Sequence, residues 1–332
     1  MRPAIDEFKP AGWCRGANAQ TVVGALFRTR PALPLIRKRI DTPDGDFLDL
    51  DFLEAKPAPA SDQPTLVILH GLEGSSRASY VLSLLGEIRK RGMRACAVNM
   101  RMCSGEPNRL VATYHSGKTE DLDSVVRYLT EKENRQRLFL VGFSIGGNII
   151  LKWLGQEGGR VSQRIEKAVV VSVPYDLSQS VELMDRGFNR EVYTRSLLRS
   201  LKAKLALKVR LHPDAVRLER VKKCRTFRVF DREVTAPLNG FRDETDYWTR
   251  ASSRPVLKDI RVPTLLIHAE DDPFFPAKLL PYEEFKKSSY LHPLIVHHGG
   301  HVGFVMGLPW KWTPWLETRI LDFLSGGIEA NC

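Results

Sequence analysis

The sequence predicts an α/β fold, in which a doubly wound, mostly parallel sheet carries an inserted helical cap. Short apolar runs alternate with amphipathic stretches over residues 49–173 and again from about residue 262 onward. This alternation is typical of successive βαβ units. Between residues 175 and 253 it stops, and charged helical patterns take its place. We therefore expect an N-terminal part of the core at 1–174, the cap at 175–253 and a C-terminal part of the core at 254–332.

Each expected strand is an apolar run that ends at a turn, and each expected helix carries apolar residues at helical spacing. An antiparallel hairpin opens the core, with strands at residues 36–42 and 48–53 around the turn Pro43-Asp44-Gly45. The remaining strands are expected at residues 66–70, 94–99, 137–143, 168–173, 264–268 and 293–298. The helices are expected at residues 80–90, 121–133, 147–156 and 315–323.

One strand runs into a catalytic motif. Residues 138–148 read Leu-Phe-Leu-Val-Gly-Phe-Ser-Ile-Gly-Gly-Asn, so Gly-x-Ser-x-Gly stands between a strand and a helix. In this context the pattern indicates a nucleophile elbow, which holds a serine in a strained turn at a helix N-terminus. Side chains in place of the two glycines would collide with the neighbouring strand and helix. We expect Ser144 to be the nucleophile, because the alternative, Cys103, lacks such a turn.

A candidate acid follows the serine along the chain, as the elbow motif requires. The strand at 264–268 runs into the sequence Ala-Glu-Asp-Asp-Pro-Phe-Phe-Pro at residues 269–276. Catalytic groups gather at this edge of a parallel sheet, just beyond the carboxyl ends of its strands. We expect Asp272 to be the acid. The adjacent Asp271 is the alternative and would otherwise cap the turn or face solvent.

A candidate base follows the last expected strand. His301 lies in the glycine-rich stretch Gly-Gly-His-Val-Gly at residues 299–303, which lets an imidazole reach the serine. His297 and His298 are expected inside the strand at 293–298, one pointing inward and one outward, with structural roles. We therefore expect His301 to be the general base.

The turn after the strand at 66–70 reads Gly-Leu-Glu-Gly-Ser and can supply an oxyanion donor. We expect an oxyanion hole made by the backbone N–H groups of Leu72 and of Ile145, which directly follows the nucleophile. A plain strand-ending turn is the alternative for this stretch. The candidates for the substrate pocket are His70, Gly71, His115, Phe188 and Tyr193, with ordinary packing as the alternative role for each.

These residues predict acyl transfer through a covalent intermediate. His301 would take the proton of Ser144, and the alkoxide would attack an acyl carbonyl. Asp272 would fix the tautomer of the imidazole and stabilise the imidazolium. Water would then hydrolyse the acyl-enzyme. This chemistry needs no cofactor and no metal, and we expect neither.

Short motifs spread along nearly the whole chain match one family. They include Gln20-Thr21, His70-Gly-Leu-Glu-Gly-Ser-Ser76, Gly142-Phe-Ser-Ile-Gly-Gly-Asn148 and Gly300-His-Val-Gly-Phe304, with further matches at residues 41–51, 99–108, 114–117, 173–177 and 271–274. In these motifs the chain resembles the YheT-like branch of the α/β-hydrolases. The resemblance implies the α/β-hydrolase fold and a serine carboxylester hydrolase, with acylglycerol lipases and phospholipases among its eukaryotic relatives.

Two positions depart from that family's pattern. Met102 stands where the family usually has glycine in the turn Asn-x-Arg-Gly-Cys-Ser-Gly, and Asn18-Ala19 precedes Gln20 where the family usually has His-Leu. Neither position belongs to the expected triad. Met102 borders the expected pocket, so we expect this departure from the family pattern to affect substrate preference.

The composition is that of an enzyme with one large domain. The 332 residues, 43% of them hydrophobic, suffice for an α/β core with one inserted segment. No apolar run is long enough to span a bilayer, and the first ten residues lack the apolar core of a secretory signal. We therefore expect a cytoplasmic protein. The cysteines show neither metal-ligand spacing nor a disulfide framework, and they are Cys14, Cys96, Cys103, Cys224 and Cys332.

The net charge of +11 comes largely from a basic segment at residues 190–228. A solvated helical face is the leading interpretation of such a segment. Peripheral contact with an anionic membrane surface is the alternative. No nucleic-acid-binding module accompanies the segment, so we expect no nucleic acid partner.

The expected function is therefore that of a serine hydrolase that cleaves carboxylic esters, with lipid or acylglycerol-type acyl esters as substrates. Two other classes are considered. A metal-dependent hydrolase would use as ligands His297, His298, His301 and Asp271 or Asp272. A noncatalytic binding protein on the same scaffold is the other alternative. A thioesterase or amidase with the same triad also stays open.

Overall fold

A central sheet of eight strands organises the computed structural model, which describes residues 8–55, 63–161 and 163–326. The strands are β1 (Ile36–Asp41), β2 (Phe47–Leu53), β3 (Thr65–Leu69), β4 (Arg94–Asn99), β5 (Leu138–Phe143), β6 (Ile165–Val171), β7 (Thr264–Ala269) and β8 (Leu291–Val296). Their order is β1-β2-β4-β3-β5-β6-β7-β8, and only the β1–β2 and β2–β4 pairs are antiparallel. The predicted mostly parallel, doubly wound sheet is confirmed. Cys332 lies outside the described residues.

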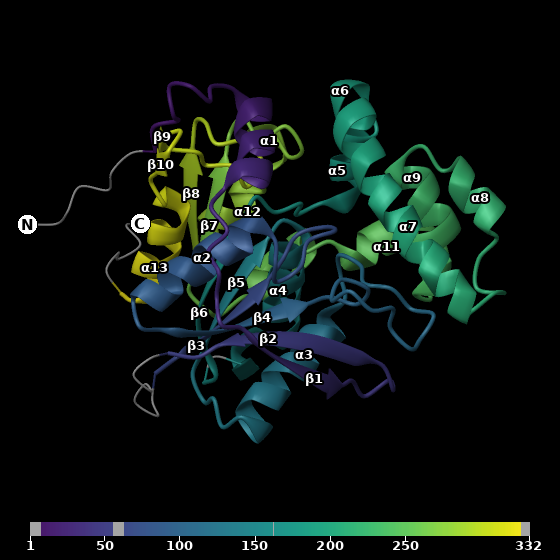
Figure 1. Ribbon diagram of the computed structural model, residues 1–332, viewed down its shortest axis with the longest axis horizontal. Coiled ribbons are helices and arrows are strands. Elements are labelled where there is room, and N and C mark those ends of the chain that lie inside the picture. Colours follow the sequence, from purple (N-terminus) through teal and green to yellow (C-terminus); the bar gives the residue numbers. More distant parts are fainter. Residues whose placement is uncertain (1–7, 56–62, 162, 327–332) are drawn as a thin grey trace, which may run out of the picture.

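Helices cover both faces of this sheet (Figure 1). One apolar layer joins the sheet to α2 (Ser79–Lys90) and α13 (Trp315–Leu324), and the other joins it to α3 (Thr119–Arg127), α4 (Ile145–Glu157) and α12 (Tyr282–Lys286). Strands buried on both faces need apolar residues at every position, which explains uninterrupted runs such as Thr-Leu-Val-Ile-Leu in β3. The first helix, α1 (Ala17–Phe27), contacts α2, and the short hairpin of β9 (Gly307–Leu308) and β10 (Lys311–Trp312) precedes α13.

The element boundaries differ from the expected ones at a few functional positions. The helix α4 begins at Ile145, two residues earlier than expected, so Ser144 is its N-cap. The helix α3 gives way to a π-helical turn at Tyr128–Lys132. The strand β8 ends at Val296, so the expectation that His297 and His298 lie inside a strand was wrong.

A helical insertion, α5 to α11, separates β6 from β7 and projects to one side of the core (Figure 1, right). Its helices are α5 (Leu177–Met184), α6 (Gly187–Asn189), α7 (Arg195–Leu211), α8 (Leu218–Lys223), α9 (Phe227–Phe230), α10 (Ala236–Leu238) and α11 (Glu244–Ala251). The insertion has its own apolar cluster. No helix in the described parts of the chain has the length and apolar character needed to cross a membrane.

Three lysines of the basic segment turn inward, so a solvated face describes only part of it. Lys208 is fully buried and donates hydrogen bonds to the carbonyl oxygens of Asn108, at 2.8 Å, and Leu110. Burial lowers the pKa of Lys208 to about 8. Lys202 donates to the Cys224 carbonyl, and Lys204 reaches the core as described below. The Lys208 contacts attach α7 to the loop that follows β4, and the Lys202 contact attaches it to the end of α8.

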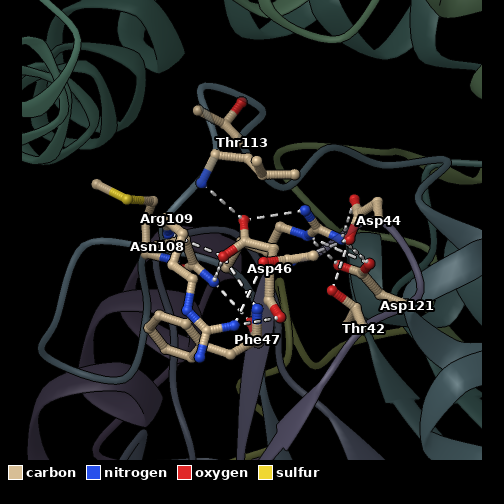
Figure 2. Close-up of polar contacts among 12 residues, drawn as sticks. Thr42, Asp44, Asp46, Phe47, Asn108, Arg109, Thr113 and Asp121 are labelled. Atoms are coloured by element: carbon tan, nitrogen blue, oxygen red, sulfur yellow. Dashed lines mark hydrogen bonds and ion pairs between the residues drawn. The ribbon is translucent and has the colours of Figure 1, made fainter.

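A buried charge network holds that loop to the rest of the core (Figure 2). The Arg101 guanidinium lies 2.7 Å from Asp121 Oδ1, 3.1 Å from Asp46 Oδ2 and 2.9 Å from Asp44 Oδ2. Asp46 also accepts a 3.1 Å hydrogen bond from Asn108. The network therefore joins the β1–β2 turn, the loop after β4 and the start of α3.

We expect the Arg101→Leu substitution to lower the free energy of unfolding by about 3–5 kcal/mol, because it leaves buried carboxylates without a counter-charge. Chemical denaturation measures this change. The control is Arg127→Leu, which removes an exposed pair with Asp123 and should cost about 0.5 kcal/mol or less. Equal losses in the two variants would contradict the structural role of the network.

Candidate active site

Ser144 occupies a strained turn between β5 and α4. Its φ of 52° lies in the left-handed region, which non-glycine residues seldom adopt. A Cβ on Gly142 would lie 2.7 Å from Gly147 Cα, and one on Gly146 would lie 2.5 Å from the His70 carbonyl oxygen. The close approach of β3, β5 and α4 thus explains both glycines of the Gly-x-Ser-x-Gly pattern.

The turn after β3 lies beside this serine. A Cβ on Gly71 would be only 3.2 Å from the Cβ of the serine. The Gly71 N–H donates to the Tyr80 hydroxyl at 2.8 Å, and the Glu73 N–H donates to the Tyr114 hydroxyl at 3.0 Å. The N–H of Leu72, between them, has no hydrogen-bond acceptor among the described residues.

A second N–H group lies at the start of α4. Ile145 is the first helical residue, and the Ser144 side chain makes no capping hydrogen bond. First-turn N–H groups have no intrahelical acceptor, and the helix dipole favours negative charge near them. Leu72 and Ile145 line the same cavity as Ser144. Both backbone donors are therefore available to an oxyanion there.

Asp272 is buried just beyond β7. Its Oδ2 lies 2.9 Å from His301 Nδ1. Its Oδ1 accepts hydrogen bonds from the N–H groups of Phe274, at 2.8 Å, and Phe275, at 3.1 Å. Burial acts to raise the pKa of Asp272, but the charge and hydrogen bond of His301 help to bring that pKa below its usual value. The ionised carboxylate is therefore the favoured form.

Asp271 has different partners. Its Oδ1 accepts a 2.9 Å hydrogen bond from the Gly300 N–H, and its Oδ2 lies 3.2 Å from His298 Nδ1. It connects the turn after β7 to the histidine loop, so it neither faces solvent freely nor contacts His301.

The histidine loop packs tightly against α1. The His301 N–H donates a 2.9 Å hydrogen bond to the Thr21 hydroxyl. The buried Gln20 side chain accepts from the Val305 N–H at 2.6 Å and donates to the Val305 carbonyl at 3.1 Å. A Cβ on Gly303 would lie 2.4 Å from the Gln20 carbonyl oxygen. Residues far away in sequence thus determine where His301 lies.

A buried ion pair supports the same loop from another side. Arg28 Nη1 lies 2.5 Å from Glu317 Oε1, and both side chains are almost fully buried. Arg28 Nη2 donates to the carbonyl oxygens of Val302 and Gly303. The Val302 N–H donates to the Ser172 hydroxyl at 3.1 Å. Contacts from α13 and from the end of β6 therefore converge on the loop.

His297 and His298 lie outside the site. They follow β8 and are exposed, and His297 Nδ1 lies 2.6 Å from Glu270 Oε2. Each of the three histidines, His301 included, therefore meets a different carboxylate. Over residues 8–55, 63–161 and 163–326, no group of three or more His, Cys, Asp or Glu side chains is placed to hold a metal ion.

His70 is a structural residue and does not line the cavity, contrary to expectation. Its Nε2 accepts a 3.1 Å hydrogen bond from the Met100 N–H, and its Nδ1 lies 2.7 Å from the Gly71 carbonyl oxygen. It joins the ends of β3 and β4. His115 does line the cavity, where its ring meets two aromatic rings edge-on.

An apolar cavity of about 490 Å³ is lined by Ser144, by His301 and by the insertion. The insertion contributes the apolar side chains of Val181, Met184, Tyr193, Leu205, Phe227, Phe230 and Val234. Phe188 does not line the cavity. It is 57% exposed and packs against the outer side of Tyr193, with ring centroids 5.9 Å apart.

Met102 also lines the cavity, and its φ is 67°. This left-handed conformation favours glycine, the residue that the resembling family usually has there. A non-glycine residue pays roughly 1 kcal/mol of strain in this region. The methionine side chain fills part of the cavity wall that a glycine would leave empty.

Cys103, the alternative nucleophile, is buried and has no elbow. Burial raises the pKa of its thiol to about 11, although the nearby Lys204 acts to lower it. A thiol that stays protonated at neutral pH is a poor nucleophile. The geometry therefore favours Ser144.

Sequence reasoning missed several supporting residues. Lys204 of α7 lies 3.0 Å from Glu73 in the turn after β3, and the Ser200 hydroxyl also donates to Glu73. The acidic residue in an otherwise apolar Gly-Leu-Glu-Gly turn was a signal for this contact. The pair Gln20-Thr21 was visible as a motif, but nothing local in the sequence indicated its partner loop.

Comparisons with known proteins support the fold. The family model for the alpha/beta hydrolase fold matches residues 64–307. YheT of Escherichia coli (strain K12), a candidate esterase, is 39% identical over 327 residues, which cover 98% of this chain and 95% of that protein. Phospholipase ABHD3 of Mus musculus is 27% identical and covers 98% of this chain and 80% of its own. The solved esterase Pf2001 of Pyrococcus furiosus has a similar fold, with a TM-score of 0.55, 17% identity and coverage of 90% and 98%.

We expect acid to destabilise the protein through its buried histidines. Burial lowers the pKa of His70 to about 4 and that of His115 to about 3, so the folded state holds both imidazoles neutral. Below the ordinary histidine pKa of about 6.5 the unfolded chain binds more protons than the folded chain. The free energy of unfolding therefore decreases as the pH is lowered. Each histidine should contribute about 1.4 kcal/mol per pH unit between about pH 6 and pH 4.5.

Urea denaturation at several pH values measures this slope. His70→Gln should reduce the slope by the share of one histidine, and a circular dichroism spectrum at neutral pH checks that the variant is folded. An unchanged slope would show that His70 does not titrate as described.

Proposed function

Since this chain belongs to the YheT-like branch of the α/β-hydrolase family, whose matched relatives carry esterase and phospholipase names, we propose that it hydrolyses carboxylic esters with lipid-type acyl chains. Ser144, His301 and Asp272 are the proposed triad. The observation that carries the proposal is the 2.9 Å contact between Asp272 and His301, made at the wall of the apolar cavity that Ser144 also lines.

In the first half-reaction, His301 Nε2 accepts the proton of the Ser144 hydroxyl while Oγ attacks the acyl carbonyl. The contact of Asp272 with Nδ1 keeps the proton on that nitrogen, so that Nε2 is free to act as base, and then stabilises the imidazolium. The N–H groups of Leu72 and Ile145 stabilise the oxyanion. His301 returns the proton to the leaving alkoxide, and the ester bond breaks.

In the second half-reaction, His301 takes a proton from water, and the hydroxide attacks the acyl-enzyme carbonyl. The same two N–H groups stabilise the second oxyanion. Collapse of the intermediate releases the carboxylic acid, and Ser144 recovers its proton. Phe274 stacks on the imidazole with ring centroids 4.2 Å apart, which supports a fixed orientation of the base throughout.

The substrate class follows from the cavity. Its walls are mainly apolar, and the insertion at 175–253 supplies much of them, which supports the role of a cap over the site. An acyl chain gains about 0.8 kcal/mol for each methylene that leaves water. Long-chain esters should therefore bind more tightly than acetyl esters.

The first test of this function is the Ser144→Ala substitution. It should lower turnover of p-nitrophenyl esters by about 10³-fold or more, because the oxyanion donors alone cannot replace the nucleophile. A fluorophosphonate probe should label the parent protein at Ser144 and leave the variant unlabelled. The control is Cys103→Ala, which should keep the label, and labelling that persists in Ser144→Ala would move the nucleophile elsewhere.

The two adjacent aspartates provide a second test. Asp272→Asn should lower turnover by up to about 10⁴-fold, because the imidazole loses its orienting carboxylate. Asp271→Asn keeps an oxygen for the Gly300 N–H and should cost about tenfold or less. One activated ester assayed with both variants decides the matter. If the Asp271→Asn variant is inactive and the Asp272→Asn variant keeps its turnover, the acid is Asp271.

A further inference from the structure

The helix α1 reverses the usual pattern of a surface helix. Its buried residues are Gln20, Thr21 and Gly24, which face the histidine loop. Its exposed residues include Leu26, at 60%, and Phe27, at 69%. A helix at a water-exposed surface normally turns its apolar side chains inward. The inner side of α1 makes polar contacts to the histidine loop, and its Val23 packs against the cluster of Ala11, Cys14 and Val305. Its remaining large apolar residues, Val22, Leu26 and Phe27, are left exposed.

Other exposed apolar side chains lie beside this helix. The Trp13 indole donates to the Gly307 carbonyl at 2.9 Å, which joins the segment before α1 to the β9–β10 hairpin. That hairpin carries Leu308 and Trp310, which are 51% and 81% exposed. In Figure 1, α1, the hairpin and α6 stand along the same edge of the molecule. We call this the mouth face, and its apolar residues are Trp13, Val22, Leu26, Phe27, Phe188, Val192, Leu308 and Trp310.

The mouth face surrounds the opening of the cavity. Val22 and Leu26 of α1 and Val192 of the insertion are all exposed, and all three also line the cavity. The Tyr193 hydroxyl donates to Asn18 at 2.8 Å, so the insertion meets α1 at this point. An apolar surface therefore continues without interruption from the exterior into the cavity. Contiguous exposed apolar patches of this kind mark a surface that binds a partner.

The charges on α1 and on the hairpin are of one sign, whereas the insertion adds the exposed Glu191, which pairs with Arg190. Residues 8–40 and residues 285–316, which carry α1 and the hairpin, contain no aspartate or glutamate. The exposed cations of these two stretches include Lys9, Arg15, Arg30 and Lys311. Apolar and tryptophan side chains flanked by lysine and arginine are the combination that suits the interface of an anionic bilayer.

We propose that the mouth face docks onto a phospholipid bilayer that contains anionic head groups. The apolar side chains of α1 and the hairpin enter the boundary between head groups and acyl chains, and the cations contact the head groups. If the protein hydrolyses esters as proposed above, the acyl substrate passes from the bilayer into the cavity without crossing water.

Vesicle sedimentation tests the docking without requiring catalysis. The probe is the parent protein with vesicles of ether-linked phosphatidylcholine, alone or mixed with ether-linked phosphatidylglycerol, which an esterase cannot cleave. The protein should sediment with the mixed vesicles, less with phosphatidylcholine alone, and less at high salt. Phe27→Ser and Trp310→Ser should each lower the partition coefficient roughly tenfold, because each removes a large apolar side chain from the interface.

Matched controls are Ile36→Ser and Leu211→Ser, whose parent side chains are 55% and 54% exposed on other elements. Both should bind vesicles as the parent does. Failure of the parent to sediment, or equal losses in mouth-face and control variants, would overturn the proposal. A parent dimer that Trp310→Ser dissociates, without vesicle binding, would instead make this face an interface between two copies of the chain.

Activity separates this proposal from the proposed function. Phe27→Ser should keep the parent turnover of a soluble acetyl ester and lose roughly tenfold on a long-chain ester embedded in mixed vesicles. Equal losses on both esters would count against docking. If the parent cleaves neither ester, the proposed function fails while sedimentation still decides the docking.

Discussion

The candidate site depends on a backbone contact between two segments that lie at opposite ends of the chain. The histidine loop approaches α1 so closely that a single Cβ on Gly303 would come within 2.4 Å of the Gln20 carbonyl oxygen. The amide of Gln20 and the hydroxyl of Thr21 satisfy the polar groups that this contact buries. Interiors are packed as densely as organic crystals, so the loop has little freedom, and His301 keeps one position relative to Asp272.

The same contact accounts for the character of the outer surface. The helix α1 turns a glutamine, a threonine and a glycine toward the histidine loop. Apolar residues such as Leu26 and Phe27 then fall on the outward side. The position of the histidine loop and the apolar rim of the cavity therefore both follow from the packing of α1 against that loop. Neither would be understood from the sequence of α1 alone.

Much of the fold was predictable because the sheet imposes strict local requirements. Strands such as β3 and β5 are covered on both faces and must be apolar throughout. The turn at Ser144 leaves no room for a side chain at Gly142 or Gly146. Other features had no local signal. The run Pro-Leu-Ile-Val-His-His contains no breaker before Gly299, so the end of β8 at Val296 was missed. In the sequence, Lys208 looks like the other cations of a solvated helix. Its burial depends on hydrogen bonds to carbonyl groups about a hundred residues away, which no local pattern indicates.

The helical insertion leaves and rejoins the core at one point. The Arg254 N–H donates to the Tyr175 carbonyl at 3.1 Å, and the Leu177 N–H donates to the Ser252 hydroxyl at 3.0 Å, so the two ends are fastened together. The entropy of closing a segment of chain rises only slowly with its length. The core can therefore accept insertions of different size and sequence at this junction without disturbing β6 or β7. The insertion is in this sense a module joined to the sheet at a single junction, and its remaining ties to the core are side-chain contacts such as that of Lys204 with Glu73.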